Sequence, residues 1–130
     1  MQPLVNFQLV TNEISVRNHH LPNGQFNISP RITRNITRDD ETHATVEIVL
    51  EIINSKEAPF PIDLRVRLSG IFDISAFPAE EVDDFLKIQA VQILFPYVRT
   101  MVSSITASAL MPPIVLPVID VRTLFPEEKT

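Results

Sequence analysis

Residues 44–54, Ala-Thr-Val-Glu-Ile-Val-Leu-Glu-Ile-Ile-Asn, alternate apolar and polar side chains along most of their length. A period of two is typical of a strand that buries one face and exposes the other. The pattern therefore predicts a strand over this range. Its buried side chains are expected to be Ala44, Val46, Ile48, Leu50 and Ile52.

A second alternating stretch follows at residues 60–74, after a short polar connection at residues 55–59. Its polar face carries Asp63, Arg65 and Arg67. The side chains expected on the buried face are Phe60, Ile62, Leu64, Val66, Leu68, Phe72 and Ile74. Because the connection is short, we expect the two strands to form an antiparallel hairpin.

Two more strands are predicted upstream, at residues 26–37 and at about residues 4–16. The inward side chains of the first of these ranges are expected to be Phe26, Ile28, Ile32 and Ile36. Pro30 lacks a backbone donor, so this strand is expected at a sheet edge. Within residues 4–16 the apolar side chains first occupy odd-numbered and then even-numbered positions, which predicts a bulge or bend at residues 11–13. The connection at residues 18–25 is long enough to cross over other elements.

From Ala79 onward the apolar period becomes helical, and acidic side chains gather where a helix N-terminus favours negative charge. We predict a helical region over about residues 79–110, which either begins near Pro96 or kinks there. Its apolar side chains cover more than one face, so it is expected to contact both its own sheet and a second subunit. The residues expected at that oligomer interface are Leu94, Tyr97, Val98, Met101 and Ile105.

The predicted fold is α+β, with a four-stranded antiparallel sheet and one long, kinked or broken helix region on one face. A chain of 130 residues is expected to form a single domain over residues 1–130. Residues 111–119 are rich in proline and are expected to be extended, and residues 126–130 form a polar tail.

The composition excludes several classes of function. The chain has two glycines, Gly24 and Gly70, which are too far apart in sequence to share a phosphate-binding loop, so P-loop, Rossmann and kinase-loop sites are excluded. The net charge of -5 argues against general nucleic-acid binding. The absence of cysteine excludes a thiol nucleophile and is compatible with a reducing compartment. No secretory signal and no membrane span are predicted, so we expect a cytoplasmic protein.

The candidates for catalysis and metal binding have simpler explanations. The histidines lack metal-ligand spacing, the helix serines lack a glycine elbow, and the acidic clusters suit a hairpin turn and a helix start. The residues concerned are His19, His20, His43, Ser103, Ser104, Ser108, Asp39, Asp40, Glu41, Glu80, Glu81, Asp83 and Asp84. A small hydrolase that uses the carboxylates is the weakest hypothesis. No catalytic residue, metal or cofactor is predicted, and the surplus of apolar residues favours oligomerisation, peptide binding or both.

Two motifs carry a resemblance to a known family. Residues 69–74 read Ser-Gly-Ile-Phe-Asp-Ile, and residues 93–99 read Ile-Leu-Phe-Pro-Tyr-Val-Arg. Residues 112–118, Pro-Pro-Ile-Val-Leu-Pro-Val, follow the helix. Together with residues 7–16, these motifs resemble the bacterial protein-export chaperone SecB and its SecB-like relatives, which carry similar segments in the same order.

The resemblance implies a four-stranded sheet with a crossover after the first strand and helices on one face. It implies a tetramer, a dimer of dimers whose long helices lie between two sheets. It also implies that unfolded polypeptide is held, without ATP, in hydrophobic grooves lined by the crossover region and by the segment after the main helix. The matching substrate-binding candidates are Phe26, Leu110, Met111, Ile114, Leu116 and Phe125, for which ordinary core positions are the alternative.

Departures from the family pattern weigh against docking to the SecA motor. On the sheet face that is acidic in the family, Glu13 remains acidic, whereas Arg17 and Arg65 reverse the sign. The chain also ends at Thr130, where the family's second helix would continue. Two functions stay open. One is a non-enzymatic chaperone for unfolded or extended polypeptide, with or without a link to export. The other is an interaction subunit with one dedicated partner, such as a chaperone linked to a toxin–antitoxin system.

Overall fold

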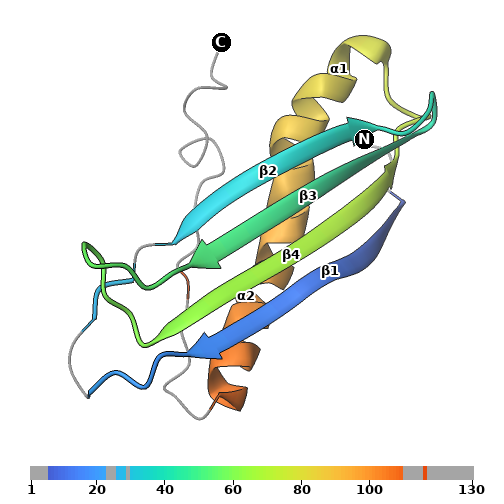
Figure 1. Ribbon diagram of the computed structural model, residues 1–130. Coiled ribbons are helices and arrows are strands. Elements are labelled where there is room, and N and C mark those ends of the chain that lie inside the picture. Colours follow the sequence, from blue (N-terminus) through green and yellow to red (C-terminus); the bar gives the residue numbers. More distant parts are fainter. Residues whose placement is uncertain (1–5, 23–25, 29, 110–115, 117–130) are drawn as a thin grey trace.

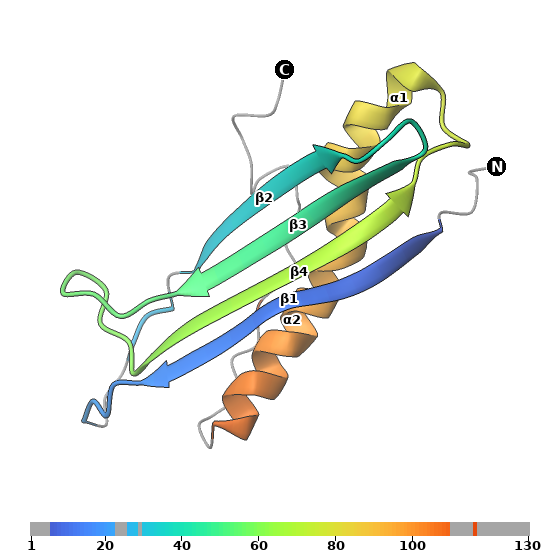
Figure 2. The same cartoon turned by 45° about the vertical axis from the view of Figure 1, so that its right-hand side comes forward.

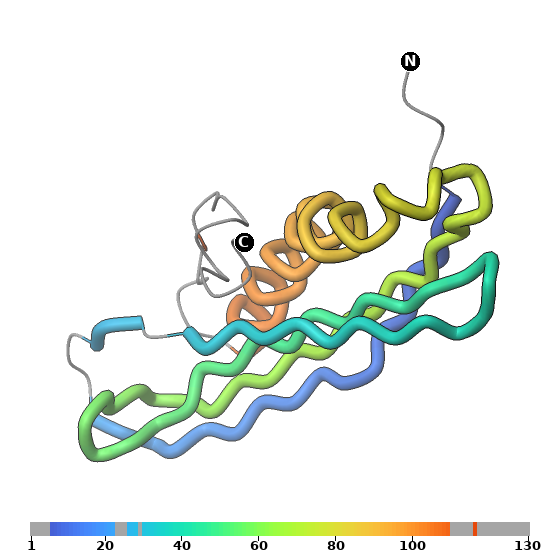
Figure 3. Tube along the Cα trace, turned by 90° about the horizontal axis from the view of Figure 1, so that it is seen from above, coloured from blue at the N-terminus to red at the C-terminus, as the bar shows by residue number. Residues whose placement is uncertain are grey.

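The computed structural model describes residues 6–22, 26–28, 30–109 and 116. In chain order the elements are β1 (Phe7–Asn18), β2 (Arg31–Arg38), β3 (His43–Ile52), β4 (Ile62–Asp73), α1 (Ala79–Asp84), the π-helical turn η1 (Phe85–Gln89) and α2 (Ala90–Ser108). They form two layers, a sheet and a helical layer that covers one of its faces (Figures 1 and 3). The α+β fold is therefore as predicted.

The sheet has the strand order β1-β4-β3-β2, with every neighbouring pair antiparallel. β1 and β2 follow each other in sequence but lie at opposite edges, so the chain crosses over between them (Figure 2). This order confirms both the crossover and the edge position of the second strand. It leaves one edge of the long strand β1 without a partner strand among the described residues.

The start of the second strand differs from the prediction. β2 begins at Arg31, five residues later than expected, because Pro30 has no N–H to donate to a ladder. Arg31 pairs with Glu51, and β3 ends at Ile52, so residues before Pro30 would have no partner on β3. Phe26 and Ile28 therefore lie outside the strand.

The register of β1 against β4 confirms the expected bulge. Thr11 pairs with Leu68 and Glu13 with Arg67, which leaves Asn12 as the extra residue. One extra residue reverses the alternation of faces beyond it. Side chains at odd positions before the bulge, such as Leu9, consequently share the helix-side face with Ile14 and Val16 after it.

The core lies between β3, β4 and the helical layer. Every side chain predicted to be buried on the third and fourth strands is at most 5% exposed. The helical side chains that meet them are Val82, Phe85, Leu86, Ala90, Val91, Leu94, Phe95, Val98 and Val102. Leu94 and Phe72 also approach Gly70, where an added Cβ would lie only 2.8 Å from each of them.

The helical layer runs from Ala79 to Ser108, so the expectation of a start near Pro96 is wrong. Pro96 lies inside α2, and the irregularity of the layer is the π turn η1 upstream of it. In an α-helix, residues three and four apart share a face. If this α-helical spacing continued backward from Val91, Lys87 would face the sheet. The additional residue of the π turn brings Leu86 there instead.

Two arginines of β2 hold this part of the helical layer. Arg34 donates from its guanidinium to the carbonyl oxygen of Lys87 in η1. Arg38 forms an ion pair of 2.9 Å with Asp83 in α1. The edge strand thus anchors the beginning of the helical layer. None of the helices in the described part of the chain has the length and hydropathy of a membrane span.

Candidate functional site

The helix-side face of β1 is apolar but incompletely covered. Phe7 is 37% exposed, Leu9 36%, Ile14 54% and Val16 40%. Phe7 stacks on the buried Phe72 with ring centroids 5.5 Å apart, so the face continues into the core. The sequence pattern predicted the alternation of this strand, but it carried no signal that the helix would leave the strand half covered.

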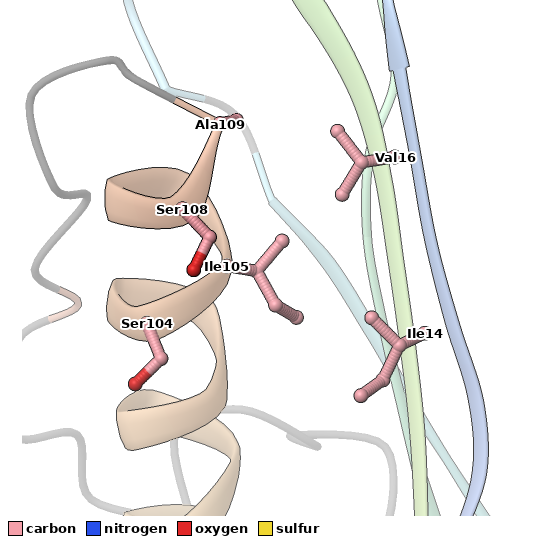
Figure 4. A pocket seen from close by; sticks show the side chains of 6 residues that line it. All are labelled: Ile14, Val16, Ser104, Ile105, Ser108 and Ala109. Atoms are coloured by element: carbon pink, nitrogen blue, oxygen red, sulfur yellow. The ribbon is translucent and has the colours of Figure 1, made fainter.

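A groove opens between this face and the end of α2. It has a volume of 470 Å³ and is lined by Ile14, Val16, Ser104, Ile105, Ser108 and Ala109. Figure 4 shows Ile105 on the helix facing Ile14 and Val16 on the strand. The lining is apolar apart from two serine hydroxyls, so it suits apolar side chains of a partner.

The outward face of α2 carries part of the expected oligomer interface. Tyr97 is 44% exposed, and Met101 and Ile105 are partly buried against the core. Leu94 and Val98 have no exposed surface, because they pack on the sheet. Tyr97 and Met101 are therefore the members of that set with surface available to a second subunit outside the groove, because Ile105 faces Ile14 and Val16 inside it.

The substrate-binding candidates are spread over the molecule. Phe26 is half-buried, with its ring edge-to-face against Phe60 at a centroid distance of 6.2 Å. Leu116 is 3% exposed, and its carbonyl oxygen accepts a hydrogen bond of 3.0 Å from Nε of Arg99. Its burial is that of a core residue. Leu110, Met111, Ile114 and Phe125 lie outside the described residues.

A polar relay supports the surroundings of Phe26. Asp63 accepts a hydrogen bond of 2.8 Å from the backbone N–H of Asn54 and lies 2.9 Å from Nε2 of His19. The Asn54 side-chain oxygen accepts a hydrogen bond of 3.0 Å from the N–H of Phe60. Desolvation raises the pKa of Asp63, but the contacts with Asn54, His19 and Arg17 outweigh it and lower that pKa.

The face of the sheet away from the helix carries a network of ion pairs. Arg65 binds Glu51 at 2.6 Å, and Arg67 binds Glu47 at 3.0 Å. Glu13 on β1 lies 3.6 Å from Arg67 and 4.0 Å from Arg65. The arginines thus compensate the glutamates of this face.

The bulge residue Asn12 connects β1 to this network of ion pairs through hydrogen bonds. Its side-chain amide donates hydrogen bonds of 2.7 Å to Glu47 on β3 and 2.7 Å to the buried Ser69 on β4. Neither Asn12 nor the relay through Asp63 was identified from the sequence, because both depend on the register between distant strands.

The carboxylate clusters lie at one end of the molecule, where the hairpin between β2 and β3 meets the start of the helical layer (Figure 1). They comprise Asp39, Asp40, Glu41, Asp73, Glu80, Glu81, Asp83 and Asp84. Asp40 accepts hydrogen bonds from the N–H groups of Thr42 and His43, as expected of a turn residue. Over the described ranges, no group of His, Asp and Glu side chains has an arrangement that could hold a metal ion.

Comparison with known proteins gives one family for nearly the whole chain. The family model described as "Preprotein translocase subunit SecB" matches residues 3–130. The protein-export protein SecB of Saccharophagus degradans is 30% identical over 105 residues, which cover 78% of this chain and 61% of that protein. An uncharacterized protein of Methanocaldococcus jannaschii is 44% identical over 64 residues, which cover 49% of this chain and 41% of that protein. The matches thus span 41% to 61% of these relatives' own lengths.

A solved structure shares the fold. It is a SecB-like chaperone of Mycobacterium tuberculosis in complex with a peptide from an antitoxin. The TM-score is 0.74 at 15% sequence identity, and the match covers 88% of this chain and 90% of that one.

Proposed function

This chain belongs to the SecB family, and from that membership we propose that it is a non-enzymatic, cytoplasmic chaperone that binds unfolded or extended polypeptide on apolar surfaces, without a cofactor. Apolar contacts are non-directional and tolerate many sequences, which is what a binder of varied unfolded chains requires.

The observation that carries this proposal is the incompletely covered apolar face of β1 with the groove beside it. A row of large apolar side chains at 36% to 54% exposure is costly to leave in water unless a partner covers it. The groove is open, so a segment of extended chain has access to it without unfolding the domain. We include Phe26, Leu110, Met111, Ile114 and Phe125 in the proposed client-binding region, as the family resemblance implies, and leave out Leu116 because it is buried in the core.

We propose further that the protein is a homo-oligomer, a dimer or tetramer, that uses the outward face of α2. Tyr97 and Met101 supply its exposed apolar surface, and Ile105 adjoins it at the groove beside β1. Leu94 and Val98 support this face from beneath. A helix with apolar side chains on two sides is stabilised when both sides are covered.

The test is suppression of aggregation and direct binding with a permanently unfolded polypeptide, reduced and carboxymethylated α-lactalbumin. Ile14→Asp places a charge on the apolar face of β1 and is expected to weaken binding about tenfold or more. Val10→Asp is the matched control, because Val10 is exposed on the same strand but pairs with Ser69 on the opposite face. Wild-type protein that neither binds the probe nor suppresses aggregation would overturn the proposal.

A second candidate is an interaction subunit for one dedicated partner. Two observations favour it: the fold is shared with a SecB-like chaperone whose structure contains an antitoxin peptide, and the outer sheet face is charge-compensated. A compensated face has little net attraction for a basic partner, which weighs against docking to the SecA motor. Recovery of one stoichiometric partner with the tagged protein would favour this candidate, whereas recovery of many polypeptides would favour the general chaperone.

A further inference from the structure

The two described ends of the connection between β1 and β2 rest on the same loop, the one between β3 and β4. At one end, the backbone N–H of His19 donates a hydrogen bond of 2.8 Å to the carbonyl oxygen of Pro61. At the other end, the ring of Phe26 packs edge-to-face on Phe60, the residue before Pro61. Displacement of this loop would therefore disturb both ends of the connection.

The carboxylate of Asp63 contacts both this loop and the start of the β1–β2 connection. One oxygen accepts a hydrogen bond of 2.8 Å from the N–H of Asn54, the second residue after the end of β3. The other lies 2.9 Å from the ring nitrogen of His19. Asn54 in turn accepts the N–H of Phe60 through its side-chain oxygen at 3.0 Å. These polar contacts thus connect Asp63, through Asn54, with the backbone N–H of Phe60.

We propose that Asp63 is a positioning residue of the polypeptide-binding region, which acts by holding Phe60 against Phe26 and by fixing where the chain leaves β1. This inference rests on the proposed function and on the place of Phe26 in the client-binding region. Asp63 touches no client itself, because it lies on the face of β4 away from the helix. Its effect is preorganisation: a loop already ordered before binding does not have to lose conformational freedom when the client arrives.

The first measurement is amide hydrogen exchange on the protein without client. In Asp63→Ala, the N–H groups of Asn54 and Phe60 are expected to exchange faster, while the amides in the middle of β3 and β4 keep their protection. Asp63→Asn retains an acceptor oxygen and is expected to restore most of the protection at Asn54. Glu51→Ala is the control, because Glu51 is another ion-paired carboxylate of the same sheet face that binds Arg65 rather than the loop.

The second measurement is a double-mutant cycle for binding of reduced, carboxymethylated α-lactalbumin. Asp63→Ala is expected to weaken binding about fivefold to tenfold, the size of effect that one or two lost hydrogen bonds produce. In a background of Phe26→Ala it is expected to have almost no further effect, because Asp63 acts through the Phe26 environment. A merely structural role would instead give additive losses.

The outcomes separate the two proposals. Additive losses, or unchanged binding in Asp63→Ala, would overturn the positioning role and leave the polypeptide-binding function standing. Failure of the wild-type protein to bind the probe would overturn the function. If the wild-type protein does not bind the probe, hydrogen exchange still tests the positioning of the loop. Unchanged exchange at Phe60 in Asp63→Ala would overturn that positioning, and faster exchange at Phe60 would support it.

Discussion

Gly70 permits the close approach of α2 to the sheet. A Cβ at this position would lie 2.8 Å from Cδ2 of Leu94 and 2.8 Å from Cε2 of Phe72, and both neighbours are fully buried. Gly70→Ala is therefore expected to lower the free energy of unfolding by about 1–3 kcal/mol, the usual cost of overpacking a core. Urea unfolding followed by circular dichroism measures the change.

The partner substitution Leu94→Ala checks this explanation. It creates space beside position 70 at its own cost in stability, so the added methyl should do less harm in its presence. The two losses together are expected to be smaller than their sum. Strictly additive losses would show that the methyl group acts elsewhere, for example on Phe72 alone.

Glu47 connects all four strands through its side chain, since it binds Asn12 on β1, Asn35 on β2 and Arg67 on β4. Desolvation raises the pKa of Glu47, but these partners outweigh it and hold the pKa below its ordinary value of 4.5. A lowered folded-state pKa stabilises the protein above the unfolded-state value, and that contribution is lost as the pH falls through the folded-state pKa.

Glu47→Gln is accordingly expected to reduce the free energy of unfolding at pH 7 by about 1 kcal/mol. It should also make the loss of stability below about pH 4.5 shallower, because one titrating carboxylate has been removed. Unfolding curves between pH 7 and pH 3 measure both effects. Glu57→Gln serves as the control in an exposed loop, and an equal effect there would contradict the role of Glu47.

The sequence predicted which side chains are buried better than it predicted which polar side chains contact one another. Inward positions of β3 and β4 followed from alternation alone, because each lies on a strand with one buried face. The partners of Asn12 and Asp63 did not follow, since a polar side chain meets whatever the register of a distant strand brings to it. Phe26 was predicted from the alternation as an inward strand residue, which is wrong because it lies outside β2, and its binding role came only from the family resemblance.

Two elements absorb one extra residue each, and only one of them was predicted. The bulge at Asn12 was visible because odd and even positions are easily distinguished in a strand. The π turn changes the helical phase between Leu86 and Val91 in the same way, but an α-helix already alternates steps of three and four. The buried pairs Phe85–Leu86 and Ala90–Val91 are five residues apart, whereas Ala90–Val91 and Leu94–Phe95 are four apart, and this difference was the signal in the sequence that was missed.

Deletion of Gln89 tests this explanation of the π turn. Gln89 is exposed, and its removal is expected to give a continuous α-helix in which Leu86 and Val91 both still face the sheet. The free energy of unfolding should change by no more than about 1–2 kcal/mol, the range of a lost hydrogen bond such as that from Arg34.

Deletion of Gln92 is the matched control, because this residue is also an exposed glutamine but lies in regular α-helix. It rotates one part of the helix by about 100° relative to the other and turns apolar side chains away from the sheet. The variant is expected to lose several kcal/mol or to fail to fold. Equal stability of the two deletions would contradict the phase argument.

At the scale of the whole molecule, the layers and strand order followed from short hairpins, one long connection and the family resemblance. The path of α2 under β1 did not follow, because the position of a helix over a sheet is set by packing that no local pattern encodes. That path leaves apolar surface on both β1 and α2, and it bears directly on assembly.

Tyr97→Asp is expected to shift the protein toward smaller species in sedimentation velocity at micromolar concentration. An unpaired charge in an apolar interface is costly, whereas the folded monomer tolerates it because Tyr97 is 44% exposed. Circular dichroism should therefore remain that of the wild type. Gln92→Asp, at another exposed position of α2, is the control. An unchanged sedimentation coefficient for Tyr97→Asp would show that this face meets water in solution.

Among the described residues, carboxylates gather around the β2–β3 hairpin and α1, whereas at the opposite end Arg17, Arg31 and Lys56 offset Asp63, Glu51 and Glu57, so the charge is unevenly distributed. Such a molecule has a large dipole moment as well as its net charge, and it turns as it approaches a charged surface. On a positively charged chromatography resin it would attach by the hairpin end. The end of the sheet next to Phe26 would then face the mobile phase, which makes an anion-exchange support a way to immobilise this protein in one orientation.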